Sequence, residues 1–177
     1  KDVTCIFIRQ AEPLGLGHAV LCAKPVIGDQ PFVVLLPDDL VESSNHSVTK
    51  QLVDIFQQEG KSIVAVEHVT KEDVSKYGIV DVSAIKDKPL TEITGILEKP
   101  KPDESPSTLG VIGRYIFTSR IFDCLEKTST GVGNEVQLTD AIRILLDKES
   151  VYAYKFEGTR YDCGSKLGYM QASIQYA

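Results

Sequence analysis

The sequence has no long run of basic residues and no long run of apolar residues, and these two absences exclude whole classes of partner. Lysine and arginine together number 19, against 25 aspartates and glutamates, which gives a formal net charge of −6. Because neutralising nucleic-acid phosphates requires clustered Lys and Arg, we expect no nucleic-acid partner. The longest apolar runs, such as "FVVLLP", are far too short to span a bilayer, so we expect no membrane partner.

Cysteine and histidine are also sparse, and neither is spaced as in a metal site or a disulfide framework. The three histidines lie far apart, and no C-x-x-C motif occurs, which disfavours zinc. The scattered cysteines predict reduced thiols and a cytoplasmic protein; they are Cys5, Cys22, Cys124 and Cys163.

The start of the chain lacks two common features, an initiator methionine and a signal peptide. Lys1 and Asp2 are followed within a few residues by apolar sequence, without a small-residue cleavage site. We therefore expect that the chain begins inside a longer protein. The 177 residues suffice for one domain with a real core, and the hydrophobic fraction of 42% is that of an ordinary globular protein.

Short apolar runs rich in β-branched residues alternate with segments of helical period, which predicts an α/β domain. The continuous apolar run at 31–38 is typical of a central strand buried on both faces. Three prolines between 100 and 106 predict a loop. Further strands are expected at 4–9, 62–69, 78–98 (as a pair joined by the turn "AIKDKPL"), 109–118 and 150–158, and helices at 17–24, 47–60, 119–127, 134–149 and from about 165. Ser47 and Gly60 are placed as the N-cap and the C-terminal stop of the helix at 47–60, and Asn134 and Gln137 as the cap and its N3 partner at the start of the helix at 134–149.

Gly15 and Gly17 stand where the first expected strand gives way to a helix, a place where glycine often lets backbone approach a ligand. The dinucleotide-binding fingerprint would require a further glycine at position 20, which is Val20. The glycine pair is therefore not that fingerprint, and its own pattern does not identify a ligand.

Acidic residues follow two of the expected strands. Asp38 and Asp39 come directly after "FVVLLP", at the end of the sheet where ligands of open α/β folds bind. Asp162 follows the last expected strand and precedes a glycine and a helix. Carboxylates converging from separate strand ends would suit Mg²⁺. Taken singly, a solvated turn at Asp38–Asp39 and a helix cap at Asp162 are the simpler interpretations.

Two further pairs of residues have weaker patterns. Glu98 and Lys99 close a strand, and neighbours on a strand point to opposite faces, so we expect them not to pair with each other. They could reach a hydroxyl and a phosphate of one ligand, although a solvated strand end is the commoner case. Tyr77–Gly78 indicates a bulge or a close backbone approach. No Ser/His/Asp arrangement is evident, and no histidine follows Cys163, so nucleophilic catalysis has little support.

Taken together, and in their order along the chain, these patterns are specific for one protein family. The series "GLGHAVLCAKP", "LPDD", "YGIVD", "LEKP", "VIGRYIF", "NEVQLTDAI" and "DCGSKLGYMQA" resembles the bacterial UTP–glucose-1-phosphate uridylyltransferases, from Thr4 to the C-terminus. The resemblance implies a single nucleotidyltransferase domain over 1–177, with a mixed, mostly parallel central sheet flanked by helices in a Rossmann-like, nucleotide-diphospho-sugar transferase fold. It also implies attack of glucose 1-phosphate on the α-phosphorus of UTP, giving UDP-glucose and pyrophosphate.

The resemblance assigns roles residue by residue. Gln10 and Gly15 match positions that hold the uracil ring. The resemblance therefore implies that the glycine turn contacts the base. The carboxylates of a Mg²⁺ site match Asp38 and Asp162. Sugar contacts match Gly78, Glu98 and the strand from Val111 to Gly113, and the cation on the sugar phosphate matches Lys99. Asp39 matches no role.

One departure from the family pattern is large. Its members begin with a glycine-rich "GxGTRxxPxT" loop that holds the triphosphate, and this chain has no such segment. We expect a piece without that loop to have little or no catalytic activity. The alternatives are a thymidylyl-type enzyme, a non-catalytic UDP-glucose-binding piece, and a glycosyltransferase, although "PDDL" lacks the D-x-D spacing. The resemblance also implies a homodimer or homotetramer.

Overall fold

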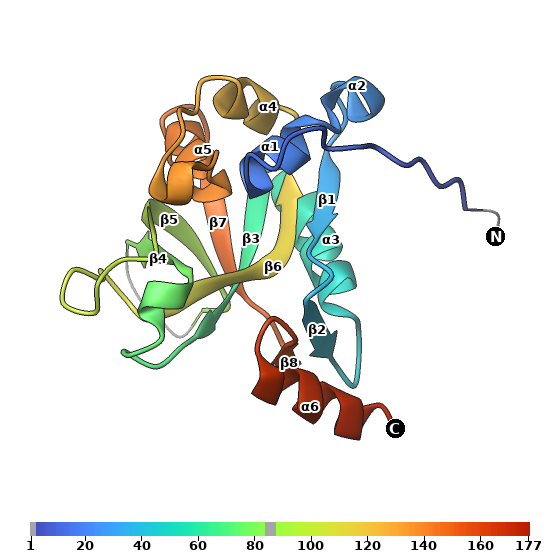
Figure 1. The fold of residues 1–177 in the computed structure, drawn as a ribbon, viewed down its shortest axis with the longest axis vertical. Helices are drawn as coiled ribbons and strands as arrows, with labels where there is room; N and C mark the ends of the chain where they lie inside the picture. Colours follow the sequence, from blue (N-terminus) through green and yellow to red (C-terminus); the bar gives the residue numbers. More distant parts are fainter. Residues whose placement is uncertain (1–2, 84–87) are drawn as a thin grey trace.

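The structure is a computed structural model that describes residues 3–83 and 88–177 (Figure 1). Its strands are β1 Phe32–Leu35, β2 Asp39–Glu42, β3 Ser62–His68, β4 Gly78–Val82, β5 Leu90–Glu98, β6 Leu109–Phe117, β7 Val151–Lys155 and β8 Thr159–Asp162. Its helices are α1 Leu16–Leu21, α2 Lys24–Ile27, α3 Val48–Glu59, α4 Arg120–Leu125, α5 Leu138–Leu146 and α6 Lys166–Gln175, with short 3₁₀ turns at Val74–Lys76 and Val132–Asn134.

A six-stranded sheet in the order β1-β6-β3-β7-β5-β4 forms the centre of the described chain. Apolar side chains of α1, α4 and α5 pack on one face of this sheet, and those of α3 pack on the other face. A separate ribbon of β2 and β8 lies below the sheet in Figure 1 and carries α6. The predicted α/β class, with a mixed sheet flanked by helices, is confirmed.

Strand direction differs from the expectation of a mostly parallel sheet. In the described part of the chain, only β3 and β7 pair in parallel. The strands β1, β3 and β4 pair antiparallel with β6, and β5 pairs antiparallel with β4 and β7. Hydrophobic periodicity reports burial and not direction, so the sequence pattern could not separate the two arrangements.

The run at 31–38 is a shorter strand than predicted, and it is not central. β1 lies at an edge of the described sheet and pairs only with β6 there. Its side chains alternate, with Val33 and Leu35 36% and 53% exposed, while the Phe32 ring stacks on Phe122 at a centroid distance of 4.9 Å. One face of this strand is therefore covered, and a continuous apolar sequence did not mean burial on both faces.

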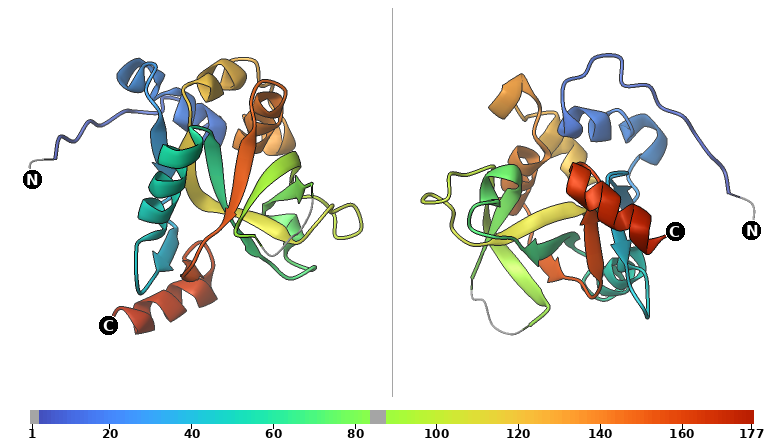
Figure 2. Two further views of the ribbon diagram at one scale, coloured as in Figure 1. Left: turned by 180° about the vertical axis from the view of Figure 1, so that it is seen from behind. Right: turned by 60° about the horizontal axis from the view of Figure 1, so that its bottom comes forward.

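The strand expected at 4–9 is absent: residues 3–10 have no regular structure. Phe7 is 96% exposed, and the segment extends away from the body of the fold (Figures 1 and 2). Apolar, β-branched residues favour a strand only where a neighbouring strand supplies hydrogen bonds and a covered face, and the described chain supplies neither to this segment.

The helix expected at 134–149 begins four residues later, at Leu138. Asn134 adopts a φ of +59°, which belongs to a turn and not to a helix cap. Asparagine tolerates this left-handed region better than most residues, so the residue that looked like a cap closes the preceding turn. Gln137, expected in the first helical turn, takes the N-cap position instead.

Other local expectations are confirmed. Ser47 caps α3 by accepting a hydrogen bond from the backbone N–H of Lys50 at 3.2 Å, and Gly60 ends that helix in the left-handed conformation. Residues 78–82 and 90–98 pair as an antiparallel hairpin. The turn expected between them lies partly outside the described residues, at 84–87. Within the described chain, no helix has the length and apolar character needed to cross a membrane.

Candidate functional site

A cavity of about 350 Å³ opens where the amino end of β4, the carboxyl ends of β5 and β8, and the start of α5 meet the middle of β6. This volume is in the range of small-molecule sites. All the site residues named from the sequence line this cavity, apart from Gln10 and Gly15; they are Asp38, Gly78, Glu98, Lys99, Val111, Gly113 and Asp162. Residues distant in sequence are thus brought to one place.

Asp38 and Asp162 converge beside Gly164. A Cβ atom added to this glycine would lie 3.1 Å from Oδ1 of Asp162 and 3.6 Å from Oδ2 of Asp38. The two backbones are tied directly, because the N–H of Cys163 donates to the carbonyl oxygen of Asp38 at 2.7 Å. The two aspartates, which are far apart in the sequence, therefore lie close together in the structure.

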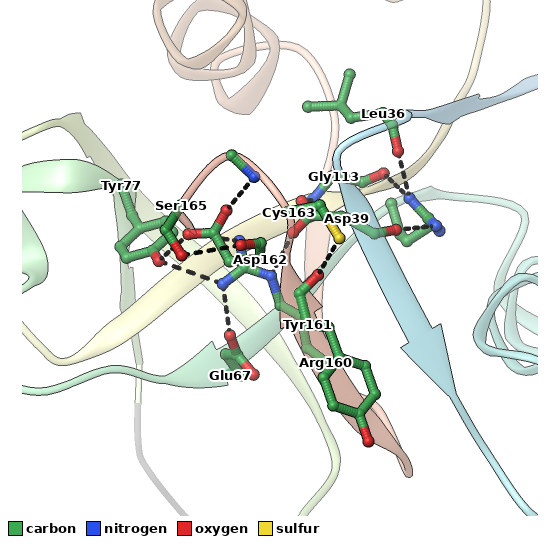
Figure 3. A network of polar contacts seen from close by, with 12 residues as sticks. Leu36, Asp39, Glu67, Tyr77, Gly113, Arg160, Tyr161, Asp162, Cys163 and Ser165 are labelled. Carbon is green, nitrogen blue, oxygen red and sulfur yellow. Dashed lines mark hydrogen bonds and ion pairs between the residues drawn. The ribbon is translucent and has the colours of Figure 1, made fainter. Parts of the chain in front are cut away.

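The Asp162 carboxylate is held by two neutral donors (Figure 3). Its Oδ1 accepts from the N–H of Gly164 at 3.0 Å, and its Oδ2 accepts from the hydroxyl of Tyr77 at 3.1 Å. Because each carboxylate oxygen has two acceptor positions, one position on each remains. Asp38 is exposed and its carboxylate makes no hydrogen bond or ion pair to the described residues. This donor set fits a hard divalent cation such as Mg²⁺.

Asp39, which matched no family role, is a buried structural residue. It is 5% exposed and forms an ion pair with Arg160. Its Oδ2 accepts from the N–H of Gly113 at 2.6 Å, and its backbone carbonyl accepts from the guanidinium of Arg114. Asp39 therefore joins β2 to β6 and β8, and its charge is paired within the protein.

Arg160 is a residue of this site that the sequence interpretation missed. Besides Asp39, it contacts Glu67 through Nη1 at 2.7 Å and lies over the ring of Tyr77, 5.1 Å from the centroid. Although burial opposes the charged form, Asp39, Tyr77 and Glu67 together raise the pKa of the Arg160 guanidinium above its ordinary value. The signal was present: alternation along a strand places Arg160 and Asp162 on the same face.

Glu98 and Lys99 lie on the same side of the chain, contrary to the expectation from strand alternation. Nζ of Lys99 is 3.5 Å from Oε1 of Glu98. The strand ends at Glu98, and Lys99 has a φ of +46°, so the alternation rule no longer applies to it. Oε2 of Glu98 also accepts from the hydroxyl of Thr139 at 3.0 Å, so a carboxylate and an ammonium group stand together at this wall.

Gly78 shows the close approach that the Tyr77–Gly78 pattern indicated. It pairs with Glu98 in the β4–β5 register, and a Cβ at this position would lie only 2.6 Å from Cγ2 of Thr139. Tyr115, also missed from the sequence, is 6% exposed and lines the same cavity. Burial raises the pKa of the Tyr115 hydroxyl, which therefore stays protonated.

Gln10 and Gly15 lie together beside the cavity and do not line it. The side-chain amide of Gln10 donates to the carbonyl of Gly15 at 3.1 Å, and Nδ1 of His18 lies 3.0 Å from the same nitrogen. Gly15 has a φ of +98°, and a Cβ there would lie 2.6 Å from Cβ of Glu135, which does line the cavity. The two residues predicted to hold a base are thus adjacent to each other.

Comparison with known proteins agrees with this geometry. The model of the nucleotidyl transferase family matches residues 1–177. A UTP–glucose-1-phosphate uridylyltransferase of Staphylococcus epidermidis is 48% identical over 177 residues, which cover 99% of this chain and 61% of that protein. The chain thus spans less than two thirds of the length of this curated relative.

Solved structures of UDP-glucose pyrophosphorylases have the same fold. One, complexed with UDP-glucose, has a TM-score of 0.91 and 45% identity, covering 96% of this chain and 64% of that one. A UTP-bound enzyme from Acinetobacter baumannii has a TM-score of 0.87 and 42% identity, covering 98% and 60%. With a family model that matches its whole length and a cavity lined by the residues the family motifs point to, this chain belongs to the nucleotidyl transferase family.

Proposed function

We propose that this chain supplies the sugar-binding and metal-binding part of a UTP–glucose-1-phosphate uridylyltransferase, which makes UDP-glucose and pyrophosphate. The observation that carries the proposal is that Asp38 and Asp162 line the same cavity as Glu98 and Lys99. A sugar phosphate needs acceptors for its hydroxyls and a cation for its phosphate, while a nucleotide phosphate needs a divalent cation. One cavity offers groups for all three.

In the proposed reaction, a phosphate oxygen of glucose 1-phosphate attacks the α-phosphorus of UTP. The bond from that phosphorus to the oxygen that bridges the α- and β-phosphates breaks, and pyrophosphate leaves with that oxygen and the electron pair. No covalent enzyme intermediate is needed, so catalysis consists of positioning and charge neutralisation. Glu98 accepts hydrogen bonds from sugar hydroxyls, Lys99 neutralises the sugar phosphate, and Gly78 and the strand from Val111 to Gly113 line the sugar pocket.

Mg²⁺ is the proposed cofactor, and Asp38 and Asp162 are its proposed ligands. When bound, the ion supplies neutralisation of the nucleotide phosphates. The chain's own contribution is to hold the two carboxylates beside Gly164 with acceptor positions left over. Gln10 and Gly15 are proposed to contact the uracil ring. A cytoplasmic location and a homodimer or homotetramer are proposed from the same resemblance.

Calorimetric titration of UDP-glucose with Mg²⁺ tests the proposal through Glu98→Ala and Lys99→Ala. Each removes a charged hydrogen-bonding group, so we expect affinity about 10- to 100-fold weaker than in the parent. Lys101→Ala is the matched control, since Lys101 is an exposed loop residue that does not line the cavity. Binding that is equal in all four proteins would contradict the assignment of the cavity.

The alternatives give different results in turnover assays. Comparable rates with dTTP and UTP would favour a thymidylyl-type enzyme. Saturable binding of UDP-glucose without turnover would favour a non-catalytic UDP-glucose-binding piece. This alternative is tested because the chain covers only 61% of the curated relative.

A further inference from the structure

We propose that Tyr77 and Arg160 are positioning residues for the Asp162 carboxylate. Tyr77 contacts Asp162 directly, and Arg160 acts through Tyr77 by fixing the direction of its hydroxyl proton (Figure 3). The inference rests on the proposed function, because it concerns the carboxylate pair to which that function assigns Mg²⁺. Neither residue matched a role in the family resemblance.

The contacts form a chain with a defined direction. Nη1 of Arg160 donates to Oε1 of Glu67 at 2.7 Å and also lies 3.4 Å from the hydroxyl oxygen of Tyr77. A guanidinium has no acceptor, so the tyrosine oxygen accepts from it. The single hydroxyl proton of Tyr77 then points to Oδ2 of Asp162, 3.1 Å away.

The charges around Arg160 leave Asp162 available for a cation. Asp39 and Glu67 make the close ion pairs with Arg160, whereas Nη2 of Arg160 is 3.9 Å from Oδ2 of Asp162. Asp162 is therefore held mainly by a neutral hydroxyl and a backbone N–H. Neutral donors orient a carboxylate without cancelling its charge, as the groups behind metal ligands commonly do.

The backbone of Asp162 is fixed independently of Tyr77. Its carbonyl accepts from the N–H and the hydroxyl of Ser165, at 3.1 and 3.0 Å. Asp162 also pairs with Asp39 in the β2–β8 ribbon, and Gly168 of α6 packs so closely that a Cβ there would lie 2.1 Å from the Asp162 carbonyl oxygen. Removing the Tyr77 hydroxyl therefore changes how the side chain is oriented, without displacing the strand.

The test is Mn²⁺ affinity of the intact protein, measured by electron paramagnetic resonance with UDP-glucose present, for the parent and Tyr77→Phe. We expect Tyr77→Phe to bind Mn²⁺ about 10-fold more weakly, the lower end of the effect of losing a group that orients a metal ligand. Its unfolding midpoint without metal should equal that of the parent. A purely structural role would lower the midpoint and leave the affinity unchanged.

Tyr161→Phe is the matched control. Tyr161 is the neighbour of Asp162 on β8, and its hydroxyl contacts Glu42 at 3.4 Å. The same chemical change there should leave Mn²⁺ affinity unchanged. Arg160→Lys keeps the charge but cannot hold Asp39, Glu67 and Tyr77 together, so we expect it to weaken Mn²⁺ binding as well.

Asp162→Asn separates failure of this inference from failure of the proposed function. If Asp162→Asn loses Mn²⁺ while Tyr77→Phe binds it as tightly as the parent, the positioning role is overturned and the metal site stands. If Asp162→Asn binds as tightly as the parent, or the parent binds no Mn²⁺ in the presence of UDP-glucose, both are overturned.

Discussion

The two regions to which the family resemblance assigns ligands are built very differently. The corner formed by β2, β8 and β6 is held by the ion pair of Asp39 with Arg160, by the N–H of Gly113 that donates to Asp39, and by the ion pair of Arg160 with Glu67 of β3. The N-terminal segment that carries Gln10 has no regular structure over residues 3–10, and it leaves Phe7 in solvent. The two sets of motif residues thus correspond to a region bound to several strands and to a largely exposed segment, because, within the described chain, the Gln10 side chain hydrogen-bonds only to residues near it in the sequence.

The largest expected effect comes from Arg160→Met, which leaves Asp39 buried without its ion-pair partner. Breaking a buried pair from one side costs about 3–5 kcal/mol, so the free energy of unfolding, measured in urea, should fall by that amount. Arg143→Met is the control, because its pair with Asp140 is at the surface and is worth about 0–1 kcal/mol. Equal losses in the two variants would show that the ion pair of Arg160 with Asp39 contributes no more to stability than a surface pair.

Gly15→Ala should cost about 2–4 kcal/mol, because alanine is strained at a φ of +98° and its Cβ would meet Cβ of Glu135 at 2.6 Å. Gly60→Ala should cost only about 1 kcal/mol, since Gly60 is left-handed with open space around it. Thermal and urea unfolding of the two variants measure the difference. A cost at Gly15 no larger than at Gly60 would extend the loosely held region past residue 10.

Tyr115 makes the stability of the cavity region depend on pH in the alkaline range. Burial raises the pKa of Tyr115 above the ordinary value of 10.0. Above pH 10 the unfolded chain ionises first and binds fewer protons than the folded chain. The free energy of unfolding therefore falls as pH rises, by up to about 1.4 kcal/mol per pH unit from this group. Below pH 10 the hydroxyl is protonated in both states and adds no slope.

Tyr115→Phe should accordingly make the decline of stability above pH 10 shallower, as measured by urea unfolding at several pH values. Tyr169→Phe, on the exposed side of α6, is the control and should leave the slope of the parent. An unchanged slope in Tyr115→Phe would mean that this hydroxyl is as accessible to water in the folded chain as in the unfolded one.

Phe7→Ala should have the smallest effect, within about 0.5 kcal/mol in this chain, because the ring is 96% exposed. Phe117→Ala, at a side chain that is fully buried in β6, should cost about 3–5 kcal/mol. Urea unfolding of both variants measures the contrast. A loss above 1 kcal/mol for Phe7→Ala would show that the N-terminal segment packs on the fold.

Local elements whose ends depend on short-range chemistry follow directly from the amino-acid sequence. Ser47 and Gly60 mark the ends of α3, and the apolar runs at 62–69 and 109–118 mark buried strands, because caps and periodicity depend only on neighbours along the chain. The sequence motifs also named residues that line the cavity, among them the carboxylates of Asp38 and Asp162. Several of those positions lie at strand ends, where the sequence shows both the pattern of the strand and the turn residues that follow it.

Tertiary contacts set four features that the sequence pattern did not predict: strand direction, the edge position of β1, the exposure of residues 3–10 and the start of α5. Each of these features depends on which distant segment supplies hydrogen bonds or buries a face of the element. Hydrophobic periodicity along the sequence carries no such information. The same reason explains the different roles of Asp38 and Asp39. The two are adjacent and chemically identical, yet Asp39 meets Arg160 and the Gly113 N–H, while Asp38 keeps an exposed carboxylate beside Asp162.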